Sequence, residues 1–223
     1  MPSIAEKIKE LHNQLPAGVS LVAVSKYHPV EQLQEAYSAG QRLFGESHAQ
    51  ELVVKAPAMP ADVQWHFIGH LQRNKVRAIM PIVTMIHSVD SIRLLNTIEK
   101  EAQRIGREVD VLLQLHVAQE EAKSGFGIDE LILLAREGAF QTYEHVRFRG
   151  LMAMATFTDD TSVIEAEFAS VAETFSTLRE EWHFPLETFT EISMGMSDDW
   201  PLAVEKGATL VRIGTDIFGP RQY

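Results

Sequence analysis

A lysine stands at the end of a short apolar segment near the start of the sequence. Lys26 follows residues 21–25, and in an extended segment it would share a face with Val22 and Val24, because side chains alternate with a period of two. The simplest interpretation is a lysine that ends a strand and extends into water. In an apolar pocket, however, loss of hydration disfavours the ammonium form, and the neutral amine can attack an aldehyde to form a Schiff base.

Two segments near the C-terminus have the composition of phosphate-binding loops. In residues 193–199, Gly195 would let the main chain approach an anion, and Ser197 could cap a helix whose free N–H groups bind phosphate. Capping alone would explain the serine without a ligand. Further along the chain, Gly214 and Thr215 follow the last apolar segment and could supply N–H and hydroxyl donors. We therefore expect a phosphate near these two loops.

An arginine and two histidines lie in similar positions. Arg212 lies between Val211 and Ile213, so in a strand it would point away from both. Its simplest role is an ion pair with a carboxylate, and its functional role would be a donor to a ring nitrogen or an oxyanion. His66 and His70 are four residues apart, which suits a metal on a helix. Because they flank a predicted strand end, we expect packing or hydrogen bonding here rather than a metal site.

The elements that must position these residues alternate along the whole chain. The predicted strands cover residues 20–25, 42–45, 64–69, 83–89, 109–117, 145–155, 188–193 and 209–214. The predicted helices between and after them cover residues 30–39, 47–55, 74–80, 91–105, 129–137, 162–181 and 198–205. Alternating strands and helices with short connections imply a parallel sheet.

Eight such units predict the α/β class and a single (β/α)8 TIM-type barrel over residues 1–223. An extra helix is expected before the first strand, within residues 1–15, and the last helix should be short or missing. The alternative is a doubly wound open sheet. In a barrel, the loops that follow the strands meet at one face, so the candidate residues would converge there.

Composition narrows the classes of function. The chain has 223 residues, 45% of them hydrophobic, and a formal net charge of −11, which disfavours a general nucleic-acid binder. It has no cysteine, so disulfides and thiolate chemistry are excluded. No apolar run approaches the ~20 residues of a membrane helix, and the N-terminus lacks a signal-peptide core. We expect a cytoplasmic protein that binds neither nucleic acid nor membrane.

Taken together, the motifs resemble one family over essentially the full length of the chain. In order, the matching segments are Ala23-Val24-Ser25-Lys26, Phe44-Gly45-Glu46, Trp65-His66-Phe67-Ile68-Gly69, Leu71-Gln72 with Asn74-Lys75, Lys123-Ser124-Gly125, Arg149-Gly150-Leu151-Met152, residues 193–199 and residues 211–219. The chain is similar to the pyridoxal phosphate homeostasis proteins, which are related to the N-terminal barrel of alanine racemase.

The resemblance implies a barrel that holds pyridoxal 5′-phosphate (PLP) as a Schiff base on Lys26. It assigns the phosphate to Ser197, Gly214 and Thr215 and the pyridine nitrogen to Arg212. An arginine there would leave that nitrogen unprotonated and make PLP a poorer electron sink. The remaining residues expected around the cofactor are Met196, Ser47 and His66.

Two positions depart from the family pattern. Ser47 stands where the family usually has asparagine, which puts a contact from that position to the cofactor in doubt. His70 stands where proline is common and adds a titratable group near the pocket mouth.

The leading hypothesis is a PLP carrier or buffer in vitamin B6 homeostasis, without clear catalytic turnover. We expect a monomer or weak dimer, with apo-forms of PLP enzymes as candidate recipients. The chain ends at Tyr223, directly after the barrel, so the additional domain of racemases is expected to be absent. The alternative is a small PLP-dependent racemase or lyase, with Tyr27 or a histidine as base. A third hypothesis is a cofactor-free Schiff-base aldolase or a phosphosugar-binding barrel.

Overall fold

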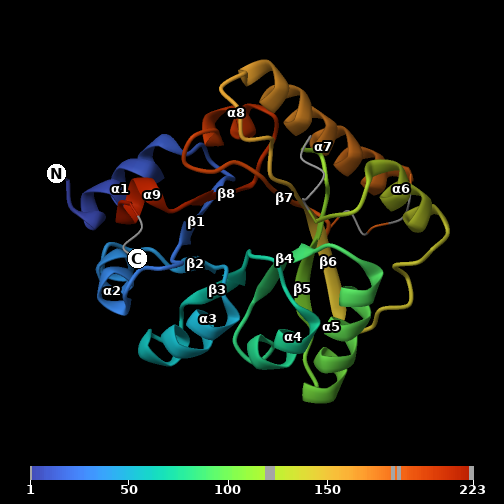
Figure 1. The fold of residues 1–223 in the computed structure, drawn as a ribbon, viewed down its shortest axis with the longest axis horizontal. Helices are drawn as coiled ribbons and strands as arrows, with labels where there is room; N and C mark the ends of the chain where they lie inside the picture. Colours follow the sequence, from blue (N-terminus) through green and yellow to red (C-terminus); the bar gives the residue numbers. More distant parts are fainter. Residues whose placement is uncertain (1, 119–123, 182–183, 185–186, 221–223) are drawn as a thin grey trace.

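Eight parallel strands close into a barrel in their order along the chain (Figure 1). The structure is a computed structural model that describes residues 2–118, 124–181, 184 and 187–220. The strands are β1 (Ser20–Val24), β2 (Leu43–Glu46), β3 (Gln64–Phe67), β4 (Met85–Val89), β5 (Val109–Gln114), β6 (Val146–Met152), β7 (Glu191–Ser193) and β8 (Leu210–Ile213). β8 pairs with β1 from Ser20 opposite Leu210 to Ala23 opposite Ile213. The predicted closed barrel is confirmed, and the open-sheet alternative is wrong.

Helices surround the barrel, and each described strand is followed by one. They are α1 (Ile4–Gln14), α2 (Val30–Ser38), α3 (Ala49–Lys55), α4 (Arg73–Ile79), α5 (Ile92–Ile105), α6 (Ile128–Arg136), α7 (Thr161–Glu181), α8 (Trp200–Glu205) and α9 (Thr215–Phe218). The extra N-terminal helix is confirmed: Ser3 accepts a hydrogen bond from the Glu6 N–H and Glu6 bonds back to Ser3, a capping box. The short 3₁₀ helix Ala56–Ala58, which the sequence pattern did not predict, extends α3.

The core has two layers because neighbouring strand residues point to opposite faces. The larger layer fills the space between the sheet and the helices and includes Val211 and Ile213. A small apolar layer inside the barrel consists of Val22, Met85, Leu112, Met152 and Leu210. The next inward positions along three of these strands carry Val24, His87 and Arg212, so polar side chains join the apolar ones toward the carboxyl end of the barrel.

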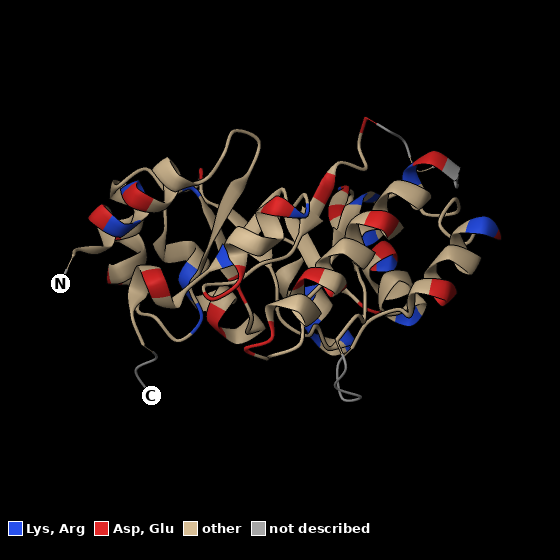
Figure 2. Ribbon diagram, turned by 90° about the horizontal axis from the view of Figure 1, so that it is seen from above, with Lys and Arg blue, Asp and Glu red and all other residues tan. Residues whose placement is uncertain are grey.

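Charge is distributed over the outside of the barrel. Figure 2 shows lysines and arginines interspersed with acidic residues along the helices. No helix in the described parts of the chain combines the length and apolar character needed to cross a membrane. Two residues named in the sequence analysis, Lys123 and Tyr223, lie outside the described residues.

Candidate functional site

A cavity of about 260 Å³ opens at the carboxyl ends of the strands. Its lining residues are Val24, Lys26, His28, Ser47, Ile68, Met154, Phe157, Met196, Ser197, Asp198, Arg212, Gly214 and Thr215. Seven of the eight predicted site residues are in this set, although they come from loops after β1, β2 and β7 and from β8 and its end. His66 is the exception and does not line the cavity.

The main chain on both sides of Lys26 is fixed by hydrogen bonds. β1 ends at Val24, and Lys26 lies half-buried in the turn that follows. The Ser25 carbonyl accepts a hydrogen bond of 2.7 Å from Lys55 Nζ, and the Tyr27 N–H donates one of 2.9 Å to Glu51 Oε2. Tyr27 has φ +66°, a left-handed conformation that is uncommon for a residue with a side chain. The turn that carries Lys26 is therefore held to α3.

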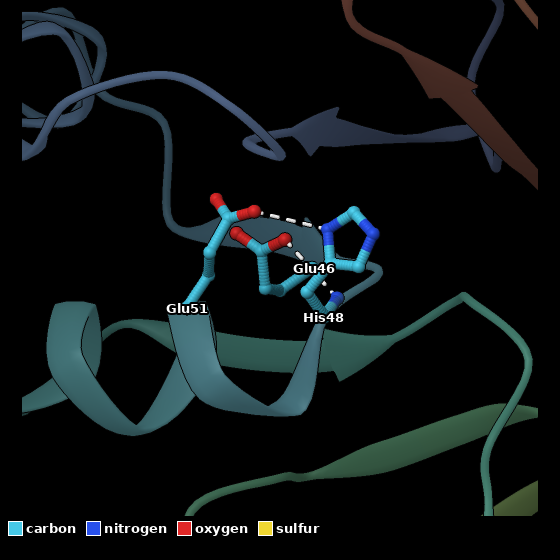
Figure 3. Close-up of side chains that lie close together, drawn as sticks. All are labelled: Glu46, His48 and Glu51. Atoms are coloured by element: carbon cyan, nitrogen blue, oxygen red, sulfur yellow. Dashed lines mark hydrogen bonds and ion pairs between the residues drawn. The ribbon is translucent and has the colours of Figure 1, made fainter.

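The groups that hold this turn form a charged cluster beside the cavity. Figure 3 shows Glu46 from the end of β2, His48 and Glu51 with their polar groups close together; one ligand atom from each lies within 4.8 Å of the others. This spacing would allow a metal ion. However, Lys55 Nζ lies 2.8 Å from Glu46 Oε2 and 2.6 Å from Glu51 Oε2, with Glu46 fully buried. Because the ammonium already pairs with both carboxylates, we interpret the cluster as structural.

Arg212 is buried beneath the cavity and remains charged near neutral pH. Burial lowers its pKa to about 10, and the nearby Asp199 carboxylate raises it. Its Nη1 donates to Ser193 Oγ at 2.7 Å, and its Nη2 donates to the Ala153 carbonyl at 2.9 Å. Since a guanidinium has five N–H groups, these two bonds fix its plane and leave further donors for the cavity that it lines.

A chain of hydrogen bonds behind Arg212 reaches His66. His87 Nδ1 lies 2.9 Å from Ser193 Oγ, and His87 Nε2 lies 2.7 Å from His66 Nδ1. Burial lowers the pKa of both histidines, that of His66 to about 3, so both rings are neutral at pH 7. Ser193 Oγ accepts from Arg212 and also bonds His87 Nδ1, so this hydroxyl links the guanidinium to the histidine pair. His66 thus supports Arg212 indirectly, which corrects its predicted place in the pocket wall.

The predicted phosphate loops occupy the rim next to Lys26. α9 begins at Thr215, and the N–H groups of Ile217 and Phe218 donate to the Gly214 carbonyl, so the N–H groups of Thr215 and Asp216 precede the first helical hydrogen bond. A Cβ on Gly214 would lie 3.2 Å from Val24 Cβ, so glycine lets the ends of β8 and β1 approach closely. Ser197 also lines the cavity.

Two details of the β7–α8 loop differ from the sequence interpretation. Ser197 does not cap α8, because the helix begins at Trp200 with Asp199 at the N-cap position; the Asp199 carboxylate instead accepts from the Met196 N–H at 2.6 Å. Gly195 has φ +90°, and a Cβ there would lie 2.9 Å from Trp200 Cα. Glycine is therefore required at position 195 by the close packing against α8 rather than by an approaching anion.

Sequence reasoning missed several lining residues. His28 is buried and lines the cavity, and burial lowers its pKa below the ordinary value. Ile68 and Phe157 also line the cavity, and Phe157 is 90% exposed at its mouth. The position of His28, two residues after Lys26 at the end of the same strand, could have indicated it; no local pattern distinguishes Phe157 from other loop residues.

The chain has clear relatives among characterised families. Residues 1–222 match the family model for the N-terminal domain of alanine racemase. A pyridoxal phosphate homeostasis protein of Haemophilus influenzae is 36% identical over 208 residues, which cover 92% of this chain and 86% of the relative. The human pyridoxal phosphate homeostasis protein is 38% identical over 213 residues, which cover 91% of this chain and 77% of the relative.

Solved structures agree with this relationship. PipY of Synechococcus elongatus PCC7942 is 38% identical; its structure without PLP has a TM-score of 0.92 and its structure with PLP bound one of 0.88, both covering 97% of this chain. Alanine racemase of Corynebacterium glutamicum shares only the fold, with a TM-score of 0.76 at 14% identity and with 61% of its length covered. The chain therefore belongs to the family of pyridoxal phosphate homeostasis proteins, built on the barrel of the alanine racemase N-terminal domain.

Proposed function

We propose that this protein binds PLP in the Lys26 cavity, as a Schiff base on Nζ, and acts as a cytoplasmic carrier or buffer in vitamin B6 homeostasis. The observation that carries the proposal is that Lys26 and the buried Arg212 line one cavity, with Gly214 and Thr215 at its rim. The structure of the related PipY with PLP bound supports it. Condensation of the lysine amine with the PLP aldehyde forms a C=N bond and releases water, which requires the neutral amine.

Each lining residue has a role that fits this cofactor. Ser197, Gly214 and Thr215 would donate to the phosphate, while Arg212 would donate to the pyridine nitrogen. When bound, PLP supplies an aldehyde and an electron-withdrawing ring, and an arginine partner weakens that withdrawal because it does not protonate the nitrogen. Met196 and Ser47 would form walls of the pocket. This arrangement suits binding of the cofactor better than catalysis with it.

A small racemase or lyase is the second candidate, and one observation favours it. His28 lines the same cavity as Lys26, and its lowered pKa keeps it neutral and able to accept a proton. Tyr27, the other base considered, does not line the cavity; its hydroxyl lies 3.5 Å from His48 Nε2. Incubation with individual amino acids, followed by chiral analysis, separates the two candidates, because sustained turnover would exclude a pure carrier.

The absorption spectrum of the purified protein with added PLP tests the binding site. Wild type should show a visible Schiff-base band that borohydride removes, and Lys26→Ala should lack it. Mass spectrometry after reduction should place the adduct on Lys26; an adduct on another lysine would refute the assignment. A colourless protein that ignores PLP would favour the cofactor-free aldolase or phosphosugar-binding barrel.

The carrier role also has a direct test. Protein loaded with PLP is mixed with an apo-form of a PLP enzyme in the presence of a scavenger that removes free PLP. A carrier should restore the activity of that enzyme faster than the same concentration of free PLP does under the same conditions. Sedimentation of the loaded protein should give a monomer or weak dimer. Restoration no faster than by spontaneous release would leave buffering as the function.

A further inference from the structure

A second cleft lies on the same face of the barrel, between the loops that follow β2 and β3. Its volume of about 240 Å³ is close to the roughly 260 Å³ of the Lys26 cavity, and Ser47 lines both, so the two share a wall. Buried Phe67 and Leu71 contribute apolar surface to it. Its polar lining comes from His48, Gln50, His70, Gln72 and Lys75.

The backbone that shapes this cleft is closely packed. A Cβ on Gly69 would lie 2.3 Å from the Ser47 carbonyl oxygen and 2.7 Å from Ser47 Cα, distances that no side chain can adopt. Only glycine therefore allows the β3–α4 loop to touch the β2–α3 loop at the shared wall. The cleft is thus defined by main-chain contacts rather than by mobile side chains alone.

The charge of the cleft is unusual for this chain. The protein has 31 acidic residues and a net charge of −11, yet none of the residues that line the cleft is acidic. The two histidines are each bound through Nδ1 to a carboxylate outside the lining, His48 to Glu51 at 2.9 Å and His70 to Asp90 at 3.2 Å. Lys75 is the cation that faces the cleft.

Lys75 is also unusual among the lysines of the protein. Three other lysines that are half-buried or buried each donate to a carbonyl or a carboxylate: Lys7, Lys55 and Lys206. Lys26 has a partner as well. Lys75 is half-buried, and its ammonium makes no hydrogen bond or ion pair with any residue that the structure describes, although its main-chain N–H donates to the Gln72 carbonyl. A partly desolvated ammonium without a partner is unfavourable, and an anion in the cleft would relieve that cost.

We propose that this cleft is a second small-molecule site, which binds a metabolite through a carboxylate or phosphate group. Lys75 supplies the positive charge, and the amides of Gln50 and Gln72, which have no partner among the described side and main chains, supply neutral donors. The shared wall at Ser47 places this ligand next to whatever occupies the Lys26 cavity. The proposal stands on the cleft itself and does not require PLP in the neighbouring cavity.

Calorimetric titration at low ionic strength tests the site with three probes: inorganic phosphate, succinate and L-glutamate. At least one should bind saturably to wild type. Lys75→Met, which keeps the aliphatic stem, should weaken that binding by about tenfold or more, as expected for loss of a charged hydrogen bond. Lys75→Arg should retain most of it. Lys206→Met is the matched control and should bind like wild type, because Lys206 is a half-buried lysine at the C-cap of α8 that does not line the cleft.

The pattern of results identifies both the ligand and the cavity. Binding of phosphate alone indicates a phosphorylated ligand, and binding of succinate or glutamate alone indicates a carboxylate. Each titration is repeated on protein whose Lys26 adduct with PLP has been fixed by borohydride and which has been freed of excess PLP, because a probe that needs the Lys26 cavity would no longer bind and one in the cleft would. Loss of binding in that protein, equal binding by Lys75→Met, or no saturable binding with a dissociation constant below about 10 mM in wild type would each overturn the proposal.

Discussion

At the scale of single residues, the position of Lys26 depends on side chains that never reach the cavity. Lys55 donates to the carbonyl of Ser25, and Glu51 accepts from the N–H of Tyr27. The two holding groups are themselves an ion pair of 2.6 Å within α3. Any change that loosens this pair should therefore alter the position of the main chain at Lys26, although the pair lies outside the lining of the cavity.

Glu51→Ala should weaken the capture of PLP by Lys26. The substitution removes the acceptor of the Tyr27 N–H, worth about 1 kcal/mol, and so should raise the concentration of PLP needed for half-maximal adduct roughly fivefold. Glu51→Gln keeps an acceptor oxygen and should lose less. The measurement is the borohydride-reducible adduct as a function of PLP concentration.

A second readout separates positioning from general destabilisation. Exchange of the Tyr27 amide hydrogen should accelerate in Glu51→Ala without PLP present, and less in Glu51→Gln. Glu99→Ala is the matched control, since Glu99 is another helix glutamate that accepts a main-chain N–H, from His145 at 3.0 Å, on an element outside the cavity lining. Equal loss of adduct in Glu99→Ala would show that Glu51 acts only through stability.

The candidate residues could be predicted from the sequence where they follow a strand. Lys26, Ser47 and Thr215 stand directly after apolar segments, and barrel geometry then brings such positions to one face. The role of His66 could not be found in this way. Its hydrogen bonds run across the barrel to His87, 21 residues away, and on to Ser193, a further 106 residues along the chain. Periodicity indicates which face a residue occupies and not which neighbour it meets across the interior.

At the scale of elements, β6 contains an irregularity that the apolar pattern did not reveal. Val111 of β5 pairs with Phe148, but the next residue, Leu112, pairs with Gly150, so one residue of β6 is extra. Gly150 has φ +149°, and a Cβ there would lie 1.7 Å from the carbonyl oxygen of Glu191 in β7. The bulge and the glycine together let β6 turn between its two partner strands.

Gly150→Ala should therefore destabilise the barrel far more than an ordinary glycine substitution. The close contact cannot be relieved without separating β6 from β7, and we expect a loss of more than about 3 kcal/mol in the free energy of unfolding or failure to fold. Gly106→Ala is the control, because Gly106 has φ +65° with open space around it and should cost only about 1 kcal/mol. Urea unfolding followed by circular dichroism compares them. Similar losses would mean that the contact is absent in solution.

The element bounds were predicted well because each strand is apolar and each helix is amphipathic. The start of α8 was the informative exception. Residues 198–205 were expected to be helical from a Ser197 cap, but Asp198 and Asp199 precede the helix in a turn closed by the Asp199 carboxylate on the Met196 N–H. Serine and aspartate favour caps and turns equally, so local composition could not decide between them.

At the scale of the whole molecule, the interior of the barrel combines an apolar layer with neutral buried histidines. His66 and His87 lie above Met85 and the other members of the inner layer, and both side chains are almost fully removed from water. The bonds of His87 to His66 and Ser193 indicate a structural role for it. Both histidines are neutral because burial disfavours their charged form, so the fold is coupled to proton concentration.

This coupling predicts that the protein loses stability as the pH falls below about 6.5. The unfolded chain binds protons on both histidines near their ordinary pKa of 6.5, whereas the pKa values in the folded state are lower, that of His66 about 3. Their contribution is thus complete above pH 6.5 and declines by about 1.4 kcal/mol per pH unit for each histidine below it. Urea unfolding should show a nearly constant midpoint from pH 8 to 7 and a clear fall from pH 6.5 to 5. A His66→Gln/His87→Gln variant, which keeps polar groups at both positions but cannot titrate there, should show a shallower fall. An unchanged slope in that variant would assign the acid sensitivity to other groups.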